Sequence, residues 1–550
     1  MAIVVFLSFF VILAIGLLLR EERKTGIREK QIEKELRKQW KERREKNFSP
    51  YEMEQISYLA KTRADENRVD ELTWENLEMD KVYQKLCYCQ SSLGEEYFYF
   101  LLRNPMRDWK KLEELEEKLQ CLSDIDTLVF LQKELIKLGK IKKRSMREYL
   151  DLFWKAEGKG NLFHYLGIIF LFLSFFWMNI SLFTGFLFFM AVLLFQIITY
   201  FKAKAELEPY LVSLRYLFRM GETAKKVIPL LPKEWQKEKE VLEKITKTMK
   251  EMEKGSGLLL SFGKMAVQGM EVIFDYVRMI FHPDIIKYNR IVKTAEKYKR
   301  EIEDLYAVLG ELDSCLSIVQ YRHILKVWTV PKEEVKEGLN IKGGYHPLVQ
   351  EPVTNDLELK KCLLLTGSNA SGKSTFLKMM GVNLLLGQSV NTCLAEDFSY
   401  PTCRLFTCLW VKDSLERKES YYMAEIKAIK GIFDASCRKE KVICLIDEVL
   451  RGTNTMERIA ASAEILLEMR KRGMIVLAAT HDRELTEILE KEYENYHFGE
   501  VIENQDIHFS FKLLPGRADS SNAIFLLSHI GYDPSIVHRA KERLEKIKGR

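Results

Sequence analysis

The chain has few prolines for its length, and its cysteines follow no metal-binding pattern. Twelve prolines in 550 residues favour long helices over a loop-rich fold. Of the ten cysteines, Cys87 and Cys89 lie close together, but no second Cys or His pair stands at metal-ligand spacing. We therefore interpret them as reduced cytosolic thiols. The net charge of +6 permits binding to nucleic acid or anionic lipid but does not require it.

Charged side chains are missing from residues 1–19, a run of apolar residues at the N-terminus. Such a run is long enough for one transmembrane helix. A cleaved signal peptide is the alternative, but it would carry basic residues before the apolar run. Here they follow it, with twelve Lys or Arg against seven Glu in residues 20–46. The sequence predicts an uncleaved anchor whose C-terminal side faces the cytoplasm.

A second stretch, residues 162–201, also contains no Asp, Glu, Lys or Arg. Forty residues suit two membrane helices with a turn at Met178–Ser181. Lysines flank both ends, at Lys155, Lys159, Lys202 and Lys204. Both ends are therefore expected in the cytoplasm, giving three spans in all. The alternative is a buried helical pair inside a soluble core, against which the apolar residues on every face argue.

The remaining sequence divides by composition. Residues 49–161 and 202–330 place apolar residues at helical spacing, and Glu234–Lys254 is typical of a lever, a coiled-coil arm or an ordinary bundle helix. Glycines and prolines in residues 331–356 mark the last domain boundary. The expected order is an anchor at 1–20, a charged and solvated stalk helix at 21–48, helical core at 49–161, a membrane hairpin at 162–201, helical core or lever at 202–330, and an α/β domain at 331–550.

Three short apolar runs in the last domain contain no charges, at residues 362–365, 442–446 and 475–479. This is expected of strands that are buried on both faces of a sheet. Helical patterns alternate with these runs. The alternation predicts an α/β sheet with a nucleotide at the carboxyl ends of its strands.

A glycine-rich segment follows the first run and matches the P-loop pattern G-x-x-x-x-G-K-[ST]. Its residues are Gly367, Ser368, Asn369, Ala370, Ser371, Gly372, Lys373, Ser374 and Thr375. The glycines let backbone N–H groups surround phosphates, and the following helix adds a favourable dipole. Lys373 is expected to reach the β- and γ-phosphates, and Ser374 to ligate Mg²⁺.

Acidic residues and a histidine follow the second and third runs. Asp447 and Glu448 end the second run. We expect Asp447 to hold Mg²⁺ and Glu448 to polarise the attacking water as general base. His481 follows the third run and is expected to sense the γ-phosphate by hydrogen bonding.

The wording around these residues resembles the MutS family of ATPases, within the ABC-type class. Residues 366–375 resemble its TGPN-x-x-GKST loop, residues 447–455 its DE-x-x-RGT-x-T segment, and residues 479–485 its ATH-x-x-EL segment. Residues 344–349 are similar to its RHP entry to the domain, and residues 72–77 and 94–105 to the start of its helical core. The resemblance implies a P-loop ATPase that uses ATP and Mg²⁺.

The resemblance also implies a homodimer with composite ATP sites. Ser420 stands in the stretch whose serine reaches the nucleotide of the partner subunit, and residues 521–540 resemble the tail that supports dimer contacts. Two features depart from the family. The mismatch-reading domain is expected to be absent, and Pro352–Asp356 holds no aromatic residue where relatives place one against adenine.

The fold class expected is therefore a P-loop ATPase domain joined to an all-α core that a membrane hairpin interrupts. One hypothesis is an ATPase of the cell membrane, with its ATPase domain in the cytoplasm, that binds DNA in repair or recombination. Its basic helical arms, such as 237–254, also hold acids, so no base readout is predicted. The alternative is a membrane mechanochemical switch that acts on a protein partner without DNA.

Overall fold

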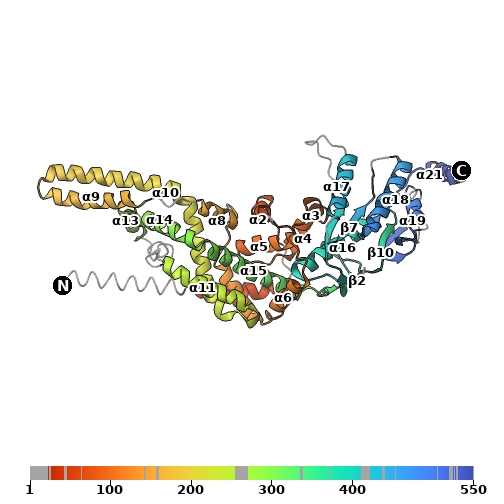
Figure 1. The fold of residues 1–550 in the computed structure, drawn as a ribbon, viewed down its shortest axis with the longest axis horizontal. Helices are drawn as coiled ribbons and strands as arrows, with labels where there is room; N and C mark the ends of the chain where they lie inside the picture. The colour runs from red at the N-terminus through yellow and green to blue at the C-terminus, as the bar shows by residue number, and fades with distance from the viewer. Residues whose placement is uncertain are drawn as a thin grey trace. The chain divides into compact units, whose positions relative to one another are not determined.

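The computed structural model describes most of the chain. The described residues are 23, 26–42, 46–63, 65–141, 144–155, 160–253, 270–334, 338–368, 371–410, 421–436, 440–451, 454–503, 506–518, 524, 527 and 530–548. They form two compact units. The helical unit comprises Met1–Arg63, Cys87–Phe100 and Glu117–Ile324, and the sheet unit comprises Ala64–Leu86, Leu101–Glu116 and Leu325–Arg550. Figure 1 labels their helices and strands.

The helical unit contains only helices among its described residues. These are α2 (Pro50–Thr62), α5 (Ser92–Arg103) up to Phe100, α7 (Ile125–Ile136), α8 (Met146–Trp154), α9 (Leu162–Met178), α10 (Leu182–Val227), α11 (Gln236–Glu253), α13 (Met270–Phe281), α14 (Pro283–Ala295) and α15 (Lys299–Ile324), with short 3-10 turns at Ile228–Leu230, Lys233–Trp235 and Glu296–Tyr298. Local signals set several starts. Ser49 and Glu52 form a capping box at α2, and the Ser145 side chain accepts from Glu148 N–H at α8.

The charged segment before α2 is packed, which differs from the solvated stalk expected there. Residues 26–39 are helical, and Leu36 and Trp40 are buried at 1% and 3% exposure. The Trp40 indole N–H donates to Gln132 Oε1 of α7 at 2.9 Å. Leu36 and Trp40 therefore face the unit, while most charged side chains of this helix are exposed.

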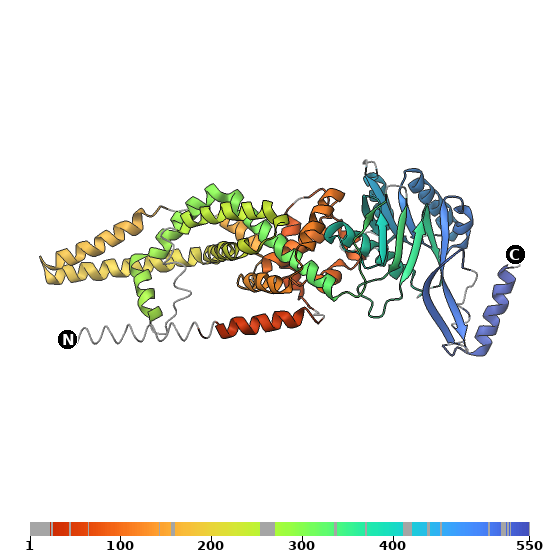
Figure 2. The same ribbon diagram turned by 90° about the horizontal axis from the view of Figure 1, so that it is seen from below.

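The apolar stretch forms a helical hairpin, α9 and α10, whose arms lie side by side in both views (Figures 1 and 2). The connection falls at Asn179–Ser181, within the turn that the sequence predicts. Many large apolar side chains are exposed on both arms, among them Phe163 and Phe183. α10 does not end at residue 201 but continues unbroken to Val227.

Among the described residues, one helix is long and apolar enough to cross a membrane. It is the Leu182–Ala205 part of α10, with a mean hydropathy of 2.3. α9 is apolar but has 17 residues. The predicted N-terminal span, residues 1–20, lies outside the described residues. The prediction of three spans is therefore not confirmed.

The sheet unit holds two sheets. One has six strands in the order β10-β9-β4-β8-β7-β6, parallel except for the β9–β10 hairpin, and the other has the order β1-β5-β2-β3. Their bounds are β1 (Lys332–Glu333), β2 (Leu339–Gly344), β3 (Asn355–Leu359), β4 (Cys362–Thr366), β5 (Asp397–Tyr400), β6 (Cys403–Cys408), β7 (Lys441–Asp447), β8 (Ile475–Ala479), β9 (Tyr493–Glu503) and β10 (Asp506–Pro515). Every residue of β4 and β8 is buried, which agrees with the charge-free runs in the sequence.

The sheet unit also contains helices among its described residues. They are α3 (Glu71–Asn76), α4 (Met79–Leu86), α6 (Trp109–Gln120) up to Glu116, α16 (Lys373–Val390), α17 (Tyr421–Ala435), α18 (Thr455–Lys471), α19 (Arg483–Ile488) and α21 (Pro534–Lys548). The main core joins β4, β7 and β8 to α17 and α18 through buried aliphatic residues such as Ile446, Leu466 and Val476.

Two parts of the expected helical core, residues 64–86 and 101–116, belong instead to the sheet unit. Hydrogen bonds explain the first. The Asn76 amide accepts from the N–H of Leu409 at 2.8 Å and donates to Trp410 O at 2.6 Å, so α3 is tied to the end of β6. In the second, the rings of Trp109 and Tyr400 pack at 5.3 Å between centroids. These contacts join residues far apart in sequence, which helical periodicity does not report.

Candidate functional site

The loop between β4 and α16 curls at the carboxyl edge of the six-stranded sheet. Gly367 and Gly372 have φ values of +145° and +109°, a region that favours glycine. The Lys373 side chain is buried, and its ammonium donates to the carbonyls of Gly367 and Ser368, both at 2.8 Å. Ser371 is 1% exposed, with its hydroxyl unpartnered among the described residues. The loop therefore gathers hydrogen-bond donors at this edge of the sheet.

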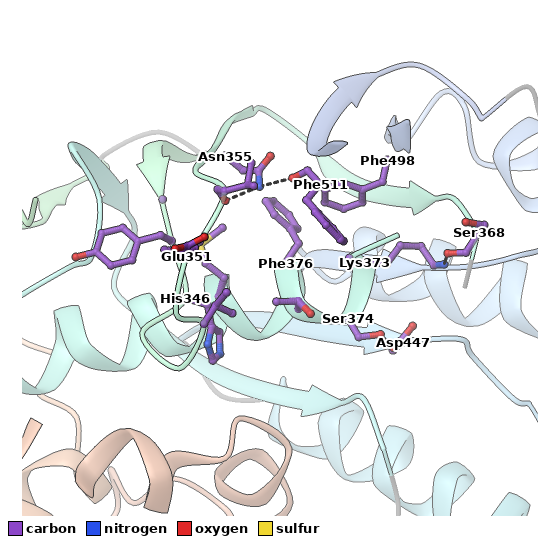
Figure 3. A pocket seen from close by; sticks show the side chains of 18 of the residues that line it. His346, Glu351, Asn355, Ser368, Lys373, Ser374, Phe376, Asp447, Phe498 and Phe511 are labelled. Atoms are coloured by element: carbon purple, nitrogen blue, oxygen red, sulfur yellow. Dashed lines mark hydrogen bonds between the residues drawn. The ribbon is translucent and has the colours of Figure 1, made fainter. Parts of the chain in front are cut away.

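Asp447 meets this loop from the neighbouring part of the sheet. It is the last residue of β7, and its Oδ2 accepts from the Ser374 hydroxyl at 2.5 Å. Both side chains stand together in the close view of Figure 3. β8 lies between β4 and β7, and parallel strands bring their carboxyl ends to one edge. The two segments that the sequence singled out thus converge.

A hydroxyl and a carboxylate are hard oxygen donors, which suit Mg²⁺. Within the described ranges, no cluster of three or more His, Cys, Asp or Glu could hold a metal by itself. Mg²⁺ is usually bound by one or two protein groups together with phosphates and water. Ser374 and Asp447 therefore fit a magnesium–nucleotide complex.

Glu448 follows Asp447, and the side chains of His481 and Arg451 hold its carboxylate. Its Oε1 lies 2.9 Å from His481 Nε2, and its Oε2 lies 2.6 Å from Arg451 Nε. The hydrogen bond from His481, followed by the charge of Arg451, lowers the pKa of Glu448. The carboxylate is therefore ionised at neutral pH, as a general base must be.

A cleft of about 380 Å³ joins these groups to three aromatic side chains. Its polar and loop residues are Ser368, Gly372, Lys373, Ser374, Thr375, Asp447, Glu448, Arg451 and His481. Phe376, Phe498 and Phe511 also line it and lie near one another in Figure 3. Phe376 and Phe498 pack edge to face with centroids 5.9 Å apart.

Phe511 was missed by sequence reasoning, which sought an aromatic residue only at Pro352–Asp356. It stands in β10 at a bulge between Phe509 and Leu513, with φ +51°. The Asn355 amide donates to its carbonyl at 3.0 Å, which ties the bulge to β3. Alternating apolar residues at 507–511 could have predicted a strand, but not that Phe511 lines the cleft.

Three of the predicted site residues cannot be placed in the cleft. Asn369, Ala370 and Ser420 lie outside the described residues. Gly367 and Ser371 belong to the loop, while the other predicted residues, from Ser368 to His481, line the cleft directly. The structure thus brings together eight of the predicted side chains and loop positions, namely Ser368, Gly372, Lys373, Ser374, Thr375, Asp447, Glu448 and His481.

Comparison with known proteins assigns this region to one family. Residues 363–548 match the model described as MutS domain V. The DNA mismatch repair protein MutS of Thermotoga sp. (strain RQ2) is 33% identical over 270 residues, covering 47% of this chain and 33% of that protein. The MutS proteins of Thermus thermophilus and Fusobacterium nucleatum are 30% and 27% identical, covering 46% and 48% of this chain and 32% and 31% of their own lengths. The chain therefore spans about a third of the length of these curated relatives.

One residue of the cleft should make stability depend on pH. His346 is 6% exposed, and its Nδ1 accepts from Leu348 N–H at 3.2 Å. Burial, followed by the charge of Lys378, lowers its pKa to about 4. Between this value and about 6.5 the unfolded chain binds the proton and the folded chain does not, so stability is complete above pH 6.5 and falls as the pH drops towards 4.

We predict that His346→Asn removes this part of the pH dependence, about 1.4 kcal/mol per pH unit between 6.5 and 4. The Asn oxygen can still accept from Leu348, so stability at pH 7 should change little. Thermal unfolding of both proteins at pH 7, 6 and 5 measures the difference. Parallel curves for the two proteins would show that His346 is not buried in its neutral form.

Proposed function

The chain belongs to the MutS family, and we propose that it binds ATP with Mg²⁺ and hydrolyses it. The single observation that carries this proposal is the convergence of Ser374 with Asp447, next to Lys373 and Glu448. This arrangement places phosphate donors, two oxygen ligands and an ionised carboxylate in one cleft.

Each of these groups has a distinct task in the proposed reaction. Lys373 exchanges two carbonyl acceptors for phosphate oxygens, which are stronger partners because they are charged. Ser374 and Asp447 hold Mg²⁺, which neutralises charge on the phosphates when bound. Glu448 accepts a proton from the attacking water, and His481 and Arg451 fix the direction of its carboxylate.

We propose that the adenine base binds against the aromatic residues that line the cleft, Phe376, Phe498 and Phe511. Aromatic stacking tolerates any base, so these residues provide affinity rather than selectivity.

We predict that Glu448→Gln retains ATP binding and lowers turnover by about 10²–10⁴-fold, the usual contribution of a general base. Glu464→Gln, on the exposed face of α18, makes the same charge change outside the cleft and should leave turnover unchanged. Steady-state ATPase and equilibrium binding of the full chain in detergent provide both values. Unchanged turnover in Glu448→Gln would reject Glu448 as the base.

We propose that two copies of the chain form a homodimer with composite ATP sites. The resemblance of residues 413–425 to the family segment that reaches the partner nucleotide supports this, with Ser420 as the reaching residue. α17 begins at the next residue, Tyr421.

We also propose that the ATPase acts on DNA, in repair or recombination. The support is similarity, since the curated relatives are DNA mismatch repair proteins. The site itself carries no information about DNA.

DNA binding is tested by its dependence on salt. Neutralising each phosphate contributes about −0.9 to the slope of log affinity against log salt for duplex DNA. We predict a clearly negative slope for the full chain in detergent, measured by fluorescence anisotropy with labelled duplex and branched DNA. A slope near zero, or no binding at low salt, would favour a protein partner instead.

A second candidate, a membrane mechanochemical switch, is favoured by α10. This helix runs unbroken from the apolar hairpin to Val227, so any rotation of its last part is carried along one rigid rod. We propose that the hairpin inserts in the cell membrane with its turn outside and the ATPase domain in the cytoplasm. Exposed apolar side chains on α9 and α10 support insertion.

Cysteine labelling tests this topology. Ile180 lies at the turn and is 69% exposed. In intact cells, a membrane-impermeant maleimide should label Ile180→Cys, while Glu464→Cys should be labelled only after lysis. The unsubstituted chain gives the background from its native thiols. Labelling of Ile180→Cys only after lysis would contradict insertion.

A further inference from the structure

The turn that carries the acid pair has an unfavourable backbone. Glu448 and Leu450 have φ values of +57° and +59°, although neither is glycine. Such a backbone conformation is strained for a residue other than glycine and persists only where its surroundings hold it. The direction of the Glu448 carboxylate therefore depends on whatever fixes this turn.

Three elements of the sheet unit hold the turn. The Glu448 N–H donates to Ala479 O of β8 at 2.9 Å, and the Ser462 hydroxyl of α18 donates to Val449 O at 3.2 Å. The third contact comes from α17, where Glu425 Oε1 accepts from the Leu450 N–H at 2.7 Å.

Glu425 is an unusual residue for this contact because its carboxyl group is buried. It is 2% exposed, and its Oε2 has no hydrogen-bond partner among the described residues. Burial raises its pKa, and the N–H groups of Leu450 and Arg451 oppose that effect. A buried carboxyl group with an unpartnered oxygen costs stability, so its retention here requires another reason.

We propose that Glu425 is a positioning residue for hydrolysis: its Oε1 fixes the Leu450 N–H and thereby aims the Glu448 carboxylate into the cleft. Arg451, whose N–H lies beside the same carboxyl group, carries the guanidinium that binds Glu448 Oε2. One acceptor on α17 therefore sets both the backbone and the charged partner of the base. This inference rests on the ATPase activity proposed above.

The proposal separates turnover from binding. Glu425 does not line the cleft, and Lys373, the group expected to reach the phosphates, is held by the carbonyls of Gly367 and Ser368 in the loop after β4. Loss of Glu425 should thus lower kcat and leave the KM for ATP unchanged. A residue that only stabilised the domain would instead reduce the fraction of active protein.

The test compares Glu425→Ala with Glu425→Gln in the full chain in detergent. The Gln side chain keeps an oxygen acceptor for Leu450 N–H, whereas Ala removes it. We expect kcat to fall about tenfold or more in Ala, which corresponds to a rise of about 1.4 kcal/mol in the activation barrier, and to stay within about threefold of the unsubstituted chain in Gln. If Ala does not fold, Glu425→Asp replaces it, with the same reduced kcat and unchanged KM expected.

Ser389→Ala is the matched control, since it also removes a fully buried hydrogen bond, from the Ser389 hydroxyl to Leu385 O, within α16. It should lower the unfolding temperature without changing kcat per folded molecule. The inference is overturned if Glu425→Ala keeps full kcat, if Gln loses as much as Ala, or if Ser389→Ala loses as much kcat as Glu425→Ala. Absence of ATPase in the unsubstituted chain would instead reject the proposed function.

Discussion

The hydrogen bond between Ser374 and Asp447 joins the two halves of the site, and the rest of the arrangement depends on it. Ser374 stands in the first turn of α16, and Asp447 ends β7, with β8 lying between β4 and β7 in the sheet. Because the strands are parallel and buried, the loops that follow them must share one edge. The meeting of Ser374 and Asp447 is therefore a consequence of sheet order rather than of loop sequence alone.

Strain is concentrated at the same edge. Gly367 and Gly372 accept left-handed backbone without cost, but Glu448 and Leu450 do not. The acid turn is held by β8, α17 and α18, so these three elements fix the backbone of Glu448, which we propose as the general base. Hydrolysis in this account depends on packing behind the cleft as much as on the residues within it.

The sequence was sufficient where chemistry and local pattern coincide. The charge-free runs at 362–365, 442–446 and 475–479 are strands, and the groups that follow them meet. It was insufficient for Phe511, which depends on a bulge, and for the placement of residues 64–86, which depends on the hydrogen bonds of Asn76. Likewise, the many charged residues of the expected stalk predicted a solvated helix, and this pattern did not predict that Leu36 and Trp40 are buried. Each of these features arises from contacts between distant segments.

We propose that Ser374 and Asp447 ligate one ion together with a nucleotide. Mn²⁺ can replace Mg²⁺ as a paramagnetic probe. Electron paramagnetic resonance of the full chain with ADP should show nucleotide-dependent Mn²⁺ binding that Ser374→Ala and Asp447→Asn each weaken, with the double variant little worse than the more affected single one. Equal binding without nucleotide, or independent and additive losses in the double variant, would contradict a shared metal–nucleotide site.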